Sequence, residues 1–127
     1  MIVLDTSAIL AILLREEEAA AFRDRLAGAG GAVVSAGTAV ELAAVASRDE
    51  ELFAAALEFL GEPFIAIEPL DEDQAIAAAH AYRRYGRGHH PPGLNLGDVF
   101  AYALARRRNL PLLYKGEDFA RTDVEPA

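Results

Sequence analysis

Four acidic side chains in this sequence have the type and the placing to do chemistry together: Asp5, Glu41, Asp98 and Asp118. Asp5 directly follows a short apolar run, Glu41 lies a few residues past a second run, and Asp118 follows the last one. Asp98 opens the helical stretch that leads into that last run. Ligands of an open parallel sheet bind outside the carboxyl ends of its strands. We therefore expect the four carboxylates to meet at one edge of a sheet.

Ordinary structural roles are also open to these residues. Asp5 could be a helix N-cap, and Asp118 could lie in a solvated turn. The pair Thr38–Glu41 has the spacing of a capping box, and the pair Asn95–Asp98 has cap spacing at the start of a helix. Taken singly, each structural role is the simpler explanation. The shared placement of all four residues favours a common site instead.

Four carboxylates at one sheet edge repel one another, because each negative charge raises the pKa of its neighbours. A hard divalent cation removes this conflict: Mg²⁺ takes oxygen ligands, keeps several waters and often bridges carboxylates to the phosphates of a substrate. The chemistry that follows is metal-assisted phosphodiester hydrolysis, in which the metal acidifies an attacking water. We expect Asp5 and Asp98 to bind the metal directly, with Glu41 and Asp118 completing the shell or positioning the water. One and two metal ions both remain open.

The elements that must position these residues alternate between strand and helix. Continuous apolar runs, typical of strands buried on both faces, lie at 2–4, 32–34, 64–67 and 110–114, and Val124 could begin a short fifth strand. Helical patterns cover 6–26 with a break near Arg15, 38–48, 49–60, 71–85 and 97–108. This alternation implies right-handed βαβ units. We predict an α/β protein, a three-layer α/β/α fold with a central parallel sheet, forming a single domain over residues 1–127.

The composition excludes several classes of protein. The chain has no cysteine, so it has no disulfide framework, thiolate metal site or cysteine nucleophile. No apolar run approaches the roughly 18 residues of a membrane span, and the start lacks the basic region of a signal peptide. We expect a cytoplasmic protein. Its net charge of −8 is not that of a general nucleic-acid binder.

Four segments match a known pattern in order and spacing over essentially the whole chain. They are MIVLDTSA (1–8), VSAGTAVE (34–41), LNLGDVFAYALA (94–105) and LLYKGEDF (112–119), followed by RTD (121–123). With them the sequence resembles the PIN-domain family, and within it the VapC-type toxins of VapBC toxin–antitoxin systems. The resemblance implies a parallel-sheet PIN fold and an endoribonuclease that depends on Mg²⁺ or Mn²⁺. It also implies inhibition by a cognate antitoxin protein and a toxin homodimer.

The resemblance also assigns individual residues. Asp5, Glu41 and Asp98 match the three most regular acidic positions of the family, and Asp118 matches the more variable fourth. Glu117 and Asp123 are alternatives for the fourth position. The resemblance implies supporting roles for Thr6, Ser7 and Asn95, which would hold an acidic ligand or a bound water. The candidates for RNA contact are Lys115 and Arg121, which lie near Asp118.

Other basic residues are better explained by structure. Two arginine clusters, at 83–87 and 106–108, end predicted helices, where positive charge complements the helix dipole; phosphate contact is the alternative. His89 and His90 lie in the Gly- and Pro-rich loop 86–93, which is neither helix nor central strand. An exposed loop is the simpler explanation for both histidines, and RNA contact is again the alternative.

Three other functions remain open. A PIN nuclease that processes RNA outside any toxin–antitoxin pair is the nearest, although the short length favours the toxin. Phosphoaspartyl receivers and phosphatases also use aspartates at the carboxyl ends of such sheets, together with a lysine, and Lys115 follows a predicted strand. A binding module without catalysis would use the acidic residues only as caps.

Overall fold

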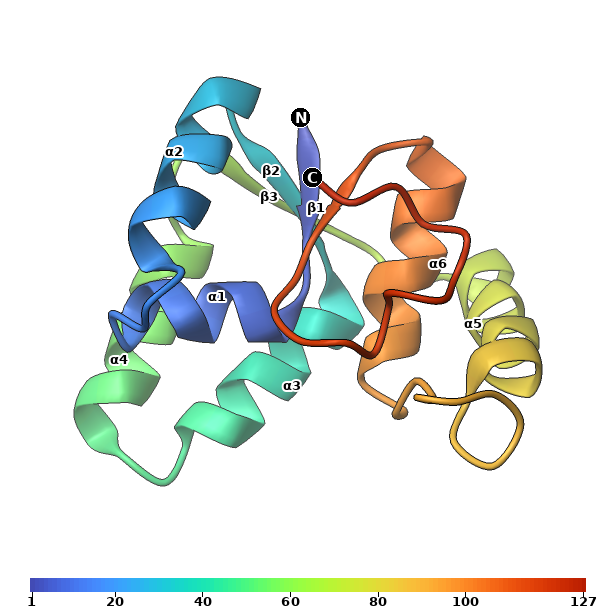
Figure 1. The fold of residues 1–127 in the computed structure, drawn as a ribbon. Helices are drawn as coiled ribbons and strands as arrows, with labels where there is room; N and C mark the ends of the chain where they lie inside the picture. The colour runs from blue at the N-terminus through green and yellow to red at the C-terminus, as the bar shows by residue number, and fades with distance from the viewer.

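The computed structural model describes all 127 residues, and its centre is a four-stranded parallel sheet in the order β3-β2-β1-β4 (Figure 1). The strands are β1 (Ile2–Leu4), β2 (Ala32–Ser35), β3 (Ile65–Glu68) and β4 (Leu112–Leu113). Val124 does not begin a fifth strand, so that expectation is wrong. The segment around it makes one isolated bridge, between Leu112 and Pro126, in which the Leu112 N–H donates to the Glu125 carbonyl and the Ala127 N–H donates to the Leu112 carbonyl.

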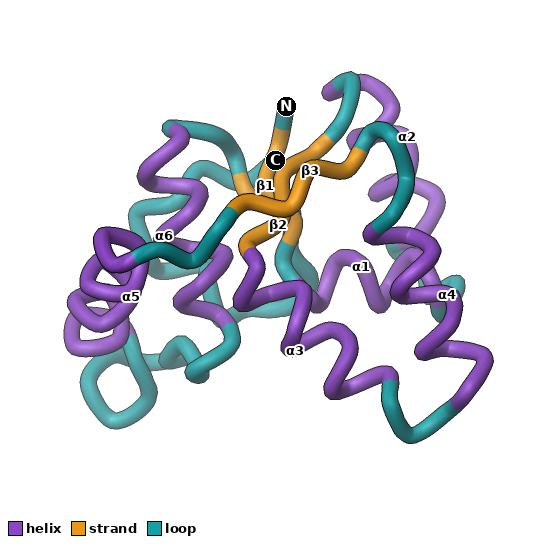
Figure 2. The backbone as a smooth tube through the Cα atoms, turned by 180° about the vertical axis from the view of Figure 1, so that it is seen from behind, coloured by secondary structure: helices purple, strands orange, loops and turns teal.

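Six helices cover the sheet: α1 (Thr6–Leu13), α2 (Ala19–Ala29), α3 (Ala36–Ala46), α4 (Glu50–Leu60), α5 (Glu72–Tyr85) and α6 (Asp98–Arg108). Helices α1 to α4 lie on one side of the sheet and α5 and α6 on the other (Figure 2). The predicted break near Arg15 is present, since Arg15 has a left-handed backbone with φ 54°. The three-layer α/β/α arrangement is therefore confirmed. None of the helices has both the length and the apolar character needed to cross a membrane.

The strands divide their side chains between two apolar clusters. In β1, Ile2 and Leu4 pack towards α1 to α4, whereas Val3 packs towards α5 and α6. Strand β2 alternates in the same way. Both faces of these central strands are thus buried, which explains their continuous apolar runs. Strand β3 differs: Ile67 is 47% exposed, so the prediction that its run is buried on both faces is wrong. Strand β4, at the opposite edge of the sheet, is buried.

Of the capping interactions expected at the starts of α3 and α6, only the one at α6 forms. Helix α3 is capped by Ser35, whose Oγ accepts from the Gly37 N–H at 3.2 Å. Thr38 is buried one turn further on, so the Thr38–Glu41 box is not formed and the Glu41 side chain is free for other contacts. The Asn95–Asp98 box does form. The Asp98 N–H donates to Asn95 Oδ1 at 2.8 Å, and the Asn95 N–H donates to Asp98 Oδ2 at 2.9 Å.

A carboxylate pocket as candidate active site

Asp5, Glu41, Asp98 and Asp118 line one pocket of about 240 Å³. Its walls are the start of α1, the second and third turns of α3, the start of α6 and the turn that follows β4, and they lie at the carboxyl-end side of the sheet. The remaining lining residues are Thr6, Ser7, Leu10, Val45, Asn95, Lys115 and Phe119. The structure thus brings together all four acidic residues that the sequence singled out, and the three polar residues expected to support them.

Asp5 uses its two carboxylate oxygens differently. Oδ2 caps α1 by accepting from the Ser7 N–H at 3.0 Å and from the Ser7 hydroxyl at 2.6 Å. Oδ1 is buried and has no hydrogen-bond partner. Burial raises the pKa of Asp5 to about 6, and repulsion by Glu41 adds to this, although the hydrogen bonds from Ser7 oppose it. An unpaired oxygen of a buried carboxylate is costly, so Oδ1 is a site where a cation would be stabilising.

Asp98 is buried beside two other carboxylates. Its side chain is only 6% exposed. Burial raises the pKa of Asp98, and the negative charges of Asp5 and Asp118 raise it further, against the lowering effect of the Asn95 N–H. Asp118 is half-buried and lines the same pocket, so a fully solvated turn is the wrong description of it. Positive charge in this pocket would favour the ionised forms of these groups.

Glu41 is positioned by Thr6 and by the absence of a side chain at Gly97. The Thr6 hydroxyl donates to Glu41 Oε1 at 2.5 Å. A Cβ built at Gly97 would overlap the Glu41 carboxylate. Gly97 has ordinary helical dihedral angles, φ −66° and ψ −36°, so space rather than backbone conformation requires glycine here. The sequence patterns did not single out Gly97, although a glycine directly before the candidate ligand Asp98 could have indicated a close approach of the backbone there.

The two alternatives for the fourth acidic position lie outside this pocket. Asp123 accepts from the Tyr102 hydroxyl at 2.5 Å and lies 3.7 Å from the Arg106 guanidinium. Glu117 lines a separate hollow together with Arg121. Of the three candidates, Asp118 is the one that the fold places beside Asp98.

Lys115 lines the pocket but is engaged elsewhere. Its Nζ lies 3.2 Å from Glu16 and 3.0 Å from Glu18, and these hydrogen bonds raise its pKa. The Lys115 backbone N–H also donates to Ser7 Oγ at 3.0 Å, which ties the turn after β4 to the start of α1. Sequence analysis did not anticipate the partners Glu16 and Glu18. A lysine already paired with two carboxylates is a poor fit to the free pocket lysine of a phosphoaspartyl receiver.

The carboxylates do not form a ready-made cage. No group of three or more His, Cys, Asp or Glu side chains is placed so that it could hold a metal ion directly. Glu41 is hydrogen-bonded to Thr6, and Asp98 accepts from a backbone N–H. Mg²⁺ commonly keeps several waters and is held by only one or two carboxylates, so this arrangement matches an open hydrated site better than a closed structural one.

Comparison with known proteins gives one consistent result. The model of the PIN domain family matches residues 2–125. The chain is 45% identical over 128 residues to Ribonuclease VapC28 of Mycobacterium tuberculosis, covering 98% of this chain and 96% of that protein.

Solved structures share the fold. The VapC20 toxin of Mycobacterium tuberculosis, described as cleaving the Sarcin-Ricin loop, superposes with a TM-score of 0.81 at 16% identity, covering 100% of this chain and 98% of that one. A toxin–antitoxin complex from Klebsiella pneumoniae gives a TM-score of 0.73 at 19% identity, covering 97% and 93% of the two chains.

Proposed function

Because this chain belongs to the PIN domain family and, within it, to the VapC group, we propose that it is a metal-dependent endoribonuclease and the toxin of a toxin–antitoxin pair. The observation that carries the proposal is the pocket shared by Asp5, Glu41, Asp98 and Asp118. The 45% identity over nearly the full length of a relative named as a ribonuclease supports RNA as the substrate class. The expected place of action is the cytoplasm.

The residues present fit a divalent cation. Asp5 Oδ1 is buried without a hydrogen-bond partner, and the pKa of both Asp5 and Asp98 is raised in this pocket. A bound cation would give Oδ1 a partner and stabilise the ionised carboxylates. Asp5 and Asp98 would hold the ion, and Glu41 and Asp118 would complete its shell through oxygen or water. Mg²⁺, or Mn²⁺ in its place, would offset the charge of the phosphate and acidify the attacking water.

The side chains of the protein itself have separate tasks. Ser7 holds Asp5 Oδ2 and so fixes the direction of the free Oδ1. Thr6 holds Glu41 Oε1, which leaves Oε2 to accept a proton from the attacking water. Leu10, Val45 and Phe119 make the apolar part of the wall. Apolar walls limit the water around the reacting phosphate and strengthen the electrostatic interactions there.

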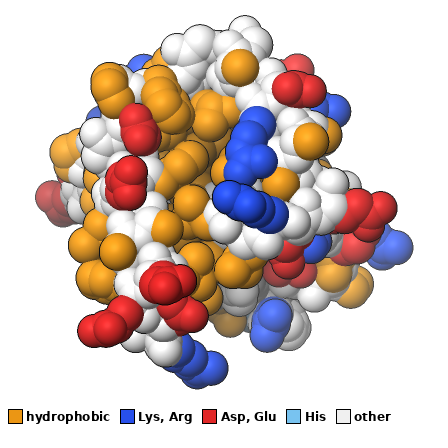
Figure 3. All heavy atoms as spheres, turned by 90° about the vertical axis from the view of Figure 1, so that its left-hand side faces the viewer, with side chains coloured by type: hydrophobic (Ala, Val, Ile, Leu, Met, Phe, Trp, Pro, Cys, Tyr) orange, Lys and Arg blue, Asp and Glu red, His pale blue; other side chains and the backbone are white.

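An apolar groove on the far side of α1 suits the antitoxin. It has a volume of about 610 Å³ and lies between α1, α2 and α4, with Leu13, Leu26, Phe59 and Phe64 among its lining residues and Arg23 at its side. Figure 3 shows apolar side chains gathering around a hollow on this face, with cationic side chains at its edge. Amphipathic helices bind such grooves through apolar anchors. We place a helix of the antitoxin here.

The homodimer would use a different surface. The large apolar residues Val40 and Leu96 are each 70% exposed, in the first half of α3 and in the turn before α6. Their chain neighbours Glu41 and Asn95 line the carboxylate pocket. A second copy of the chain covering Val40 and Leu96 would remove both from water and lie next to the pocket.

The decisive experiment is cleavage of total RNA by purified protein free of antitoxin, with Mg²⁺ or Mn²⁺. We expect discrete fragments that disappear with EDTA and in Asp98→Asn, because the variant removes a charge from the cation site. Asp24→Asn is the matched control, since it makes the same change at an exposed residue of α2 that lines none of these pockets, and it should cut normally. Cleavage that survives in Asp98→Asn or in EDTA would sink the proposal.

A further inference from the structure

One stretch of the chain has a charge opposite to that of the whole. No acidic residue lies between Asp73 and Asp98, yet this stretch holds three arginines and all three histidines of the chain. The rest of the chain therefore carries nine of the twelve basic residues against all twenty acidic ones. Positive charge is concentrated at the end of α5 and in the loop that follows it, which leads to the start of α6 (Figure 1).

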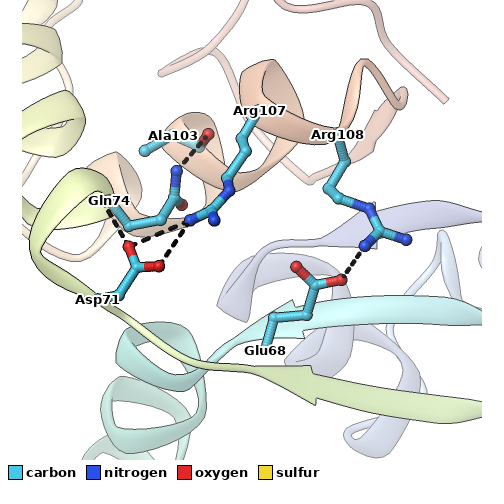
Figure 4. A network of polar contacts seen from close by, with 6 residues as sticks. All are labelled: Glu68, Asp71, Gln74, Ala103, Arg107 and Arg108. Atoms are coloured by element: carbon cyan, nitrogen blue, oxygen red, sulfur yellow. Dashed lines mark hydrogen bonds and ion pairs between the residues drawn. The ribbon is translucent and has the colours of Figure 1, made fainter.

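Four of the nine basic residues outside this stretch are neutralised by acidic partners, whereas no ion pair is made by Arg15, Arg23, Arg25, Arg48 and Arg121. Three arginines at the end of α6 are held by acidic partners: Arg106 by Asp123 at 3.7 Å, Arg107 by Asp71 at 3.0 Å and Arg108 by Glu68 at 2.7 Å. Figure 4 shows the last two of these pairs.

Lys115 is likewise paired, with Glu16 and Glu18. By contrast, Arg83, Arg84, Arg87 and Arg121 are exposed and make no ion pair. These four cations are available to an incoming anion.

The loop is held in a defined shape. The Arg87 N–H donates to the Leu94 carbonyl at 3.0 Å, and the Leu94 N–H donates to the Tyr85 carbonyl at 2.8 Å. Leu94 is fully buried, and the His90 ring packs edge-on against Tyr85 with centroids 5.1 Å apart. Anchoring at both ends and through one ring reduces the entropy that the loop would lose on binding a ligand.

Two hollows connect this loop to the carboxylate pocket. The first, of about 510 Å³, is lined only by loop residues, from Arg87 to Pro92. The second, of about 340 Å³, lies between Pro91–Pro92 and the turn after β4, where Arg121 is part of its wall. The same turn supplies Asp118 to the carboxylate pocket. The first two hollows share Pro91 and Pro92, and the second is joined to the carboxylate pocket by the chain neighbours Glu117 and Asp118. Arg87 and Arg121 bring positive charge to the two outer hollows, with Glu117 as the one acidic residue in their walls.

We propose that the loop 86–93 and Arg121 form a track that binds the ribose-phosphate backbone of the RNA next to the cleavage point. Arg87 and Arg121 contact phosphates, for which the forked guanidinium is suited. The exposed His89 ring provides a face on which an unpaired base stacks. The track rests on the proposed ribonuclease function and adds the direction in which the substrate leaves the pocket. Lys115 is paired with Glu16 and Glu18, so Arg87 takes its place beside Arg121 as a candidate for RNA contact.

The test measures RNA binding without cleavage. The probe is a fluorescein-labelled single-stranded RNA of about twelve nucleotides, and its Kd is measured by anisotropy in EDTA at several salt concentrations. In the double variant Arg87→Ala/Arg121→Ala we expect Kd to rise about tenfold or more at low salt. The slope of log K against log salt should fall by about 1.4, since each phosphate contact on a single strand contributes about 0.7.

The matched control is Arg15→Ala/Arg48→Ala, which removes two exposed arginines that line none of the three hollows. It should bind RNA with nearly the Kd and slope of the unmodified protein. The track is overturned if the loop variant binds like the unmodified protein, if the control loses as much affinity, or if the unmodified protein does not bind the RNA. Failure of the nuclease proposal is distinct: the protein would then bind RNA through the loop in EDTA but cut nothing with Mg²⁺ or Mn²⁺.

Discussion

Asp5 fills two roles that sequence reasoning treated as rivals. One oxygen caps α1, as the simpler structural explanation predicts, and the other is left without a partner in the pocket. Asp98 does the same, since Oδ2 accepts from Asn95 while the side chain lines the pocket. A carboxylate has two oxygens, so capping and ligand binding are compatible. The helix cap also fixes the direction of the second oxygen.

The choice among Asp118, Glu117 and Asp123 shows the limit of sequence at this scale. All three follow β4 within a short stretch, and their spacing does not distinguish them. The path of the turn decides: Tyr102 and Arg106 of α6 take up Asp123, whereas Asp118 turns into the pocket. These partners are distant in sequence, so only the folded chain separates the three candidates.

The raised pKa values predict how stability depends on pH. Burial raises the pKa of Asp5 to about 6, and it also raises the pKa of Asp98 well above the ordinary value of an aspartate. The folded protein therefore binds more protons than the unfolded chain between pH 4 and these values, and stability falls as pH rises through that window. Without metal, we expect urea unfolding to show a loss on the order of 2 kcal/mol from pH 5 to pH 8.

Asp98→Asn should remove much of this loss, because an amide keeps the acceptor for the Asn95 N–H but does not ionise. Mn²⁺ added at pH 8 should restore stability to the unmodified protein and have less effect on the variant. Asp71, whose pKa is lowered, acts in the opposite sense and only below pH 4, outside this window. An unfolding free energy that is constant or rises from pH 5 to pH 8 would show that the pKa values of these carboxylates are not raised in the folded protein.

At the scale of elements, the positions of all four strands were predictable, but the exposure of β3 was not. The apolar runs of β1 and β2 identify them because helices cover both of their faces. The run at β3 looks the same in sequence, yet Ala66 and Ile67 are exposed there, whereas β4 at the opposite edge is buried. A local pattern records residue type but not position within a sheet. The start of α3 was misplaced for a related reason: Thr38 has the type of a cap but is buried inside the helix.

Gly97 controls how closely α6 approaches α3. Alanine suits helical backbone, and on an open surface it stabilises relative to glycine by about 0.5–1 kcal/mol. At Gly97 the new Cβ would overlap the Glu41 carboxylate. We therefore expect Gly97→Ala to lower the free energy of unfolding by about 1–3 kcal/mol. We also expect a loss of RNA cleavage of about tenfold or more, because Glu41 must leave its contact with Thr6.

Gly28→Ala is the control for this prediction, since a Cβ at Gly28, in α2, meets nothing within 4 Å, and it should stabilise the protein without changing cleavage. The double variant Gly97→Ala/Glu41→Ala should be more stable than the sum of the two single changes, because removing the carboxylate relieves the overlap. If Gly97→Ala behaved like Gly28→Ala, Glu41 would have room that the structure does not give it.

At the scale of the whole molecule, the groove proposed for the antitoxin lies apart from the surfaces proposed for RNA and for a second copy of the chain. The apolar groove belongs to α1, α2 and α4, whereas Val40 and Leu96 belong to α3 and the turn before α6. The basic loop follows α5 on the opposite side of the sheet from the groove (Figure 2). The antitoxin can therefore bind a face of its own, whereas a second copy of the toxin would lie next to the pocket that takes the RNA.

Because the groove and the surface of Val40 lie on different parts of the molecule, we expect one substitution to remove only the antitoxin and another to remove only the dimer. Leu13→Glu places a charge in the groove, where Leu13 is half-buried, and Val40→Glu places one on a side chain that is 70% exposed. Co-expression with the cognate antitoxin, followed by affinity purification and light scattering, measures both partners. Leu13→Glu should lose the antitoxin by about a hundredfold in Kd and remain dimeric, because its face does not touch the second copy. Val40→Glu should become monomeric and still retain the antitoxin. If either change abolished both associations while the thermal unfolding midpoint stayed unchanged, the two partners would share one surface, and the assignment of the groove to the antitoxin alone would be wrong.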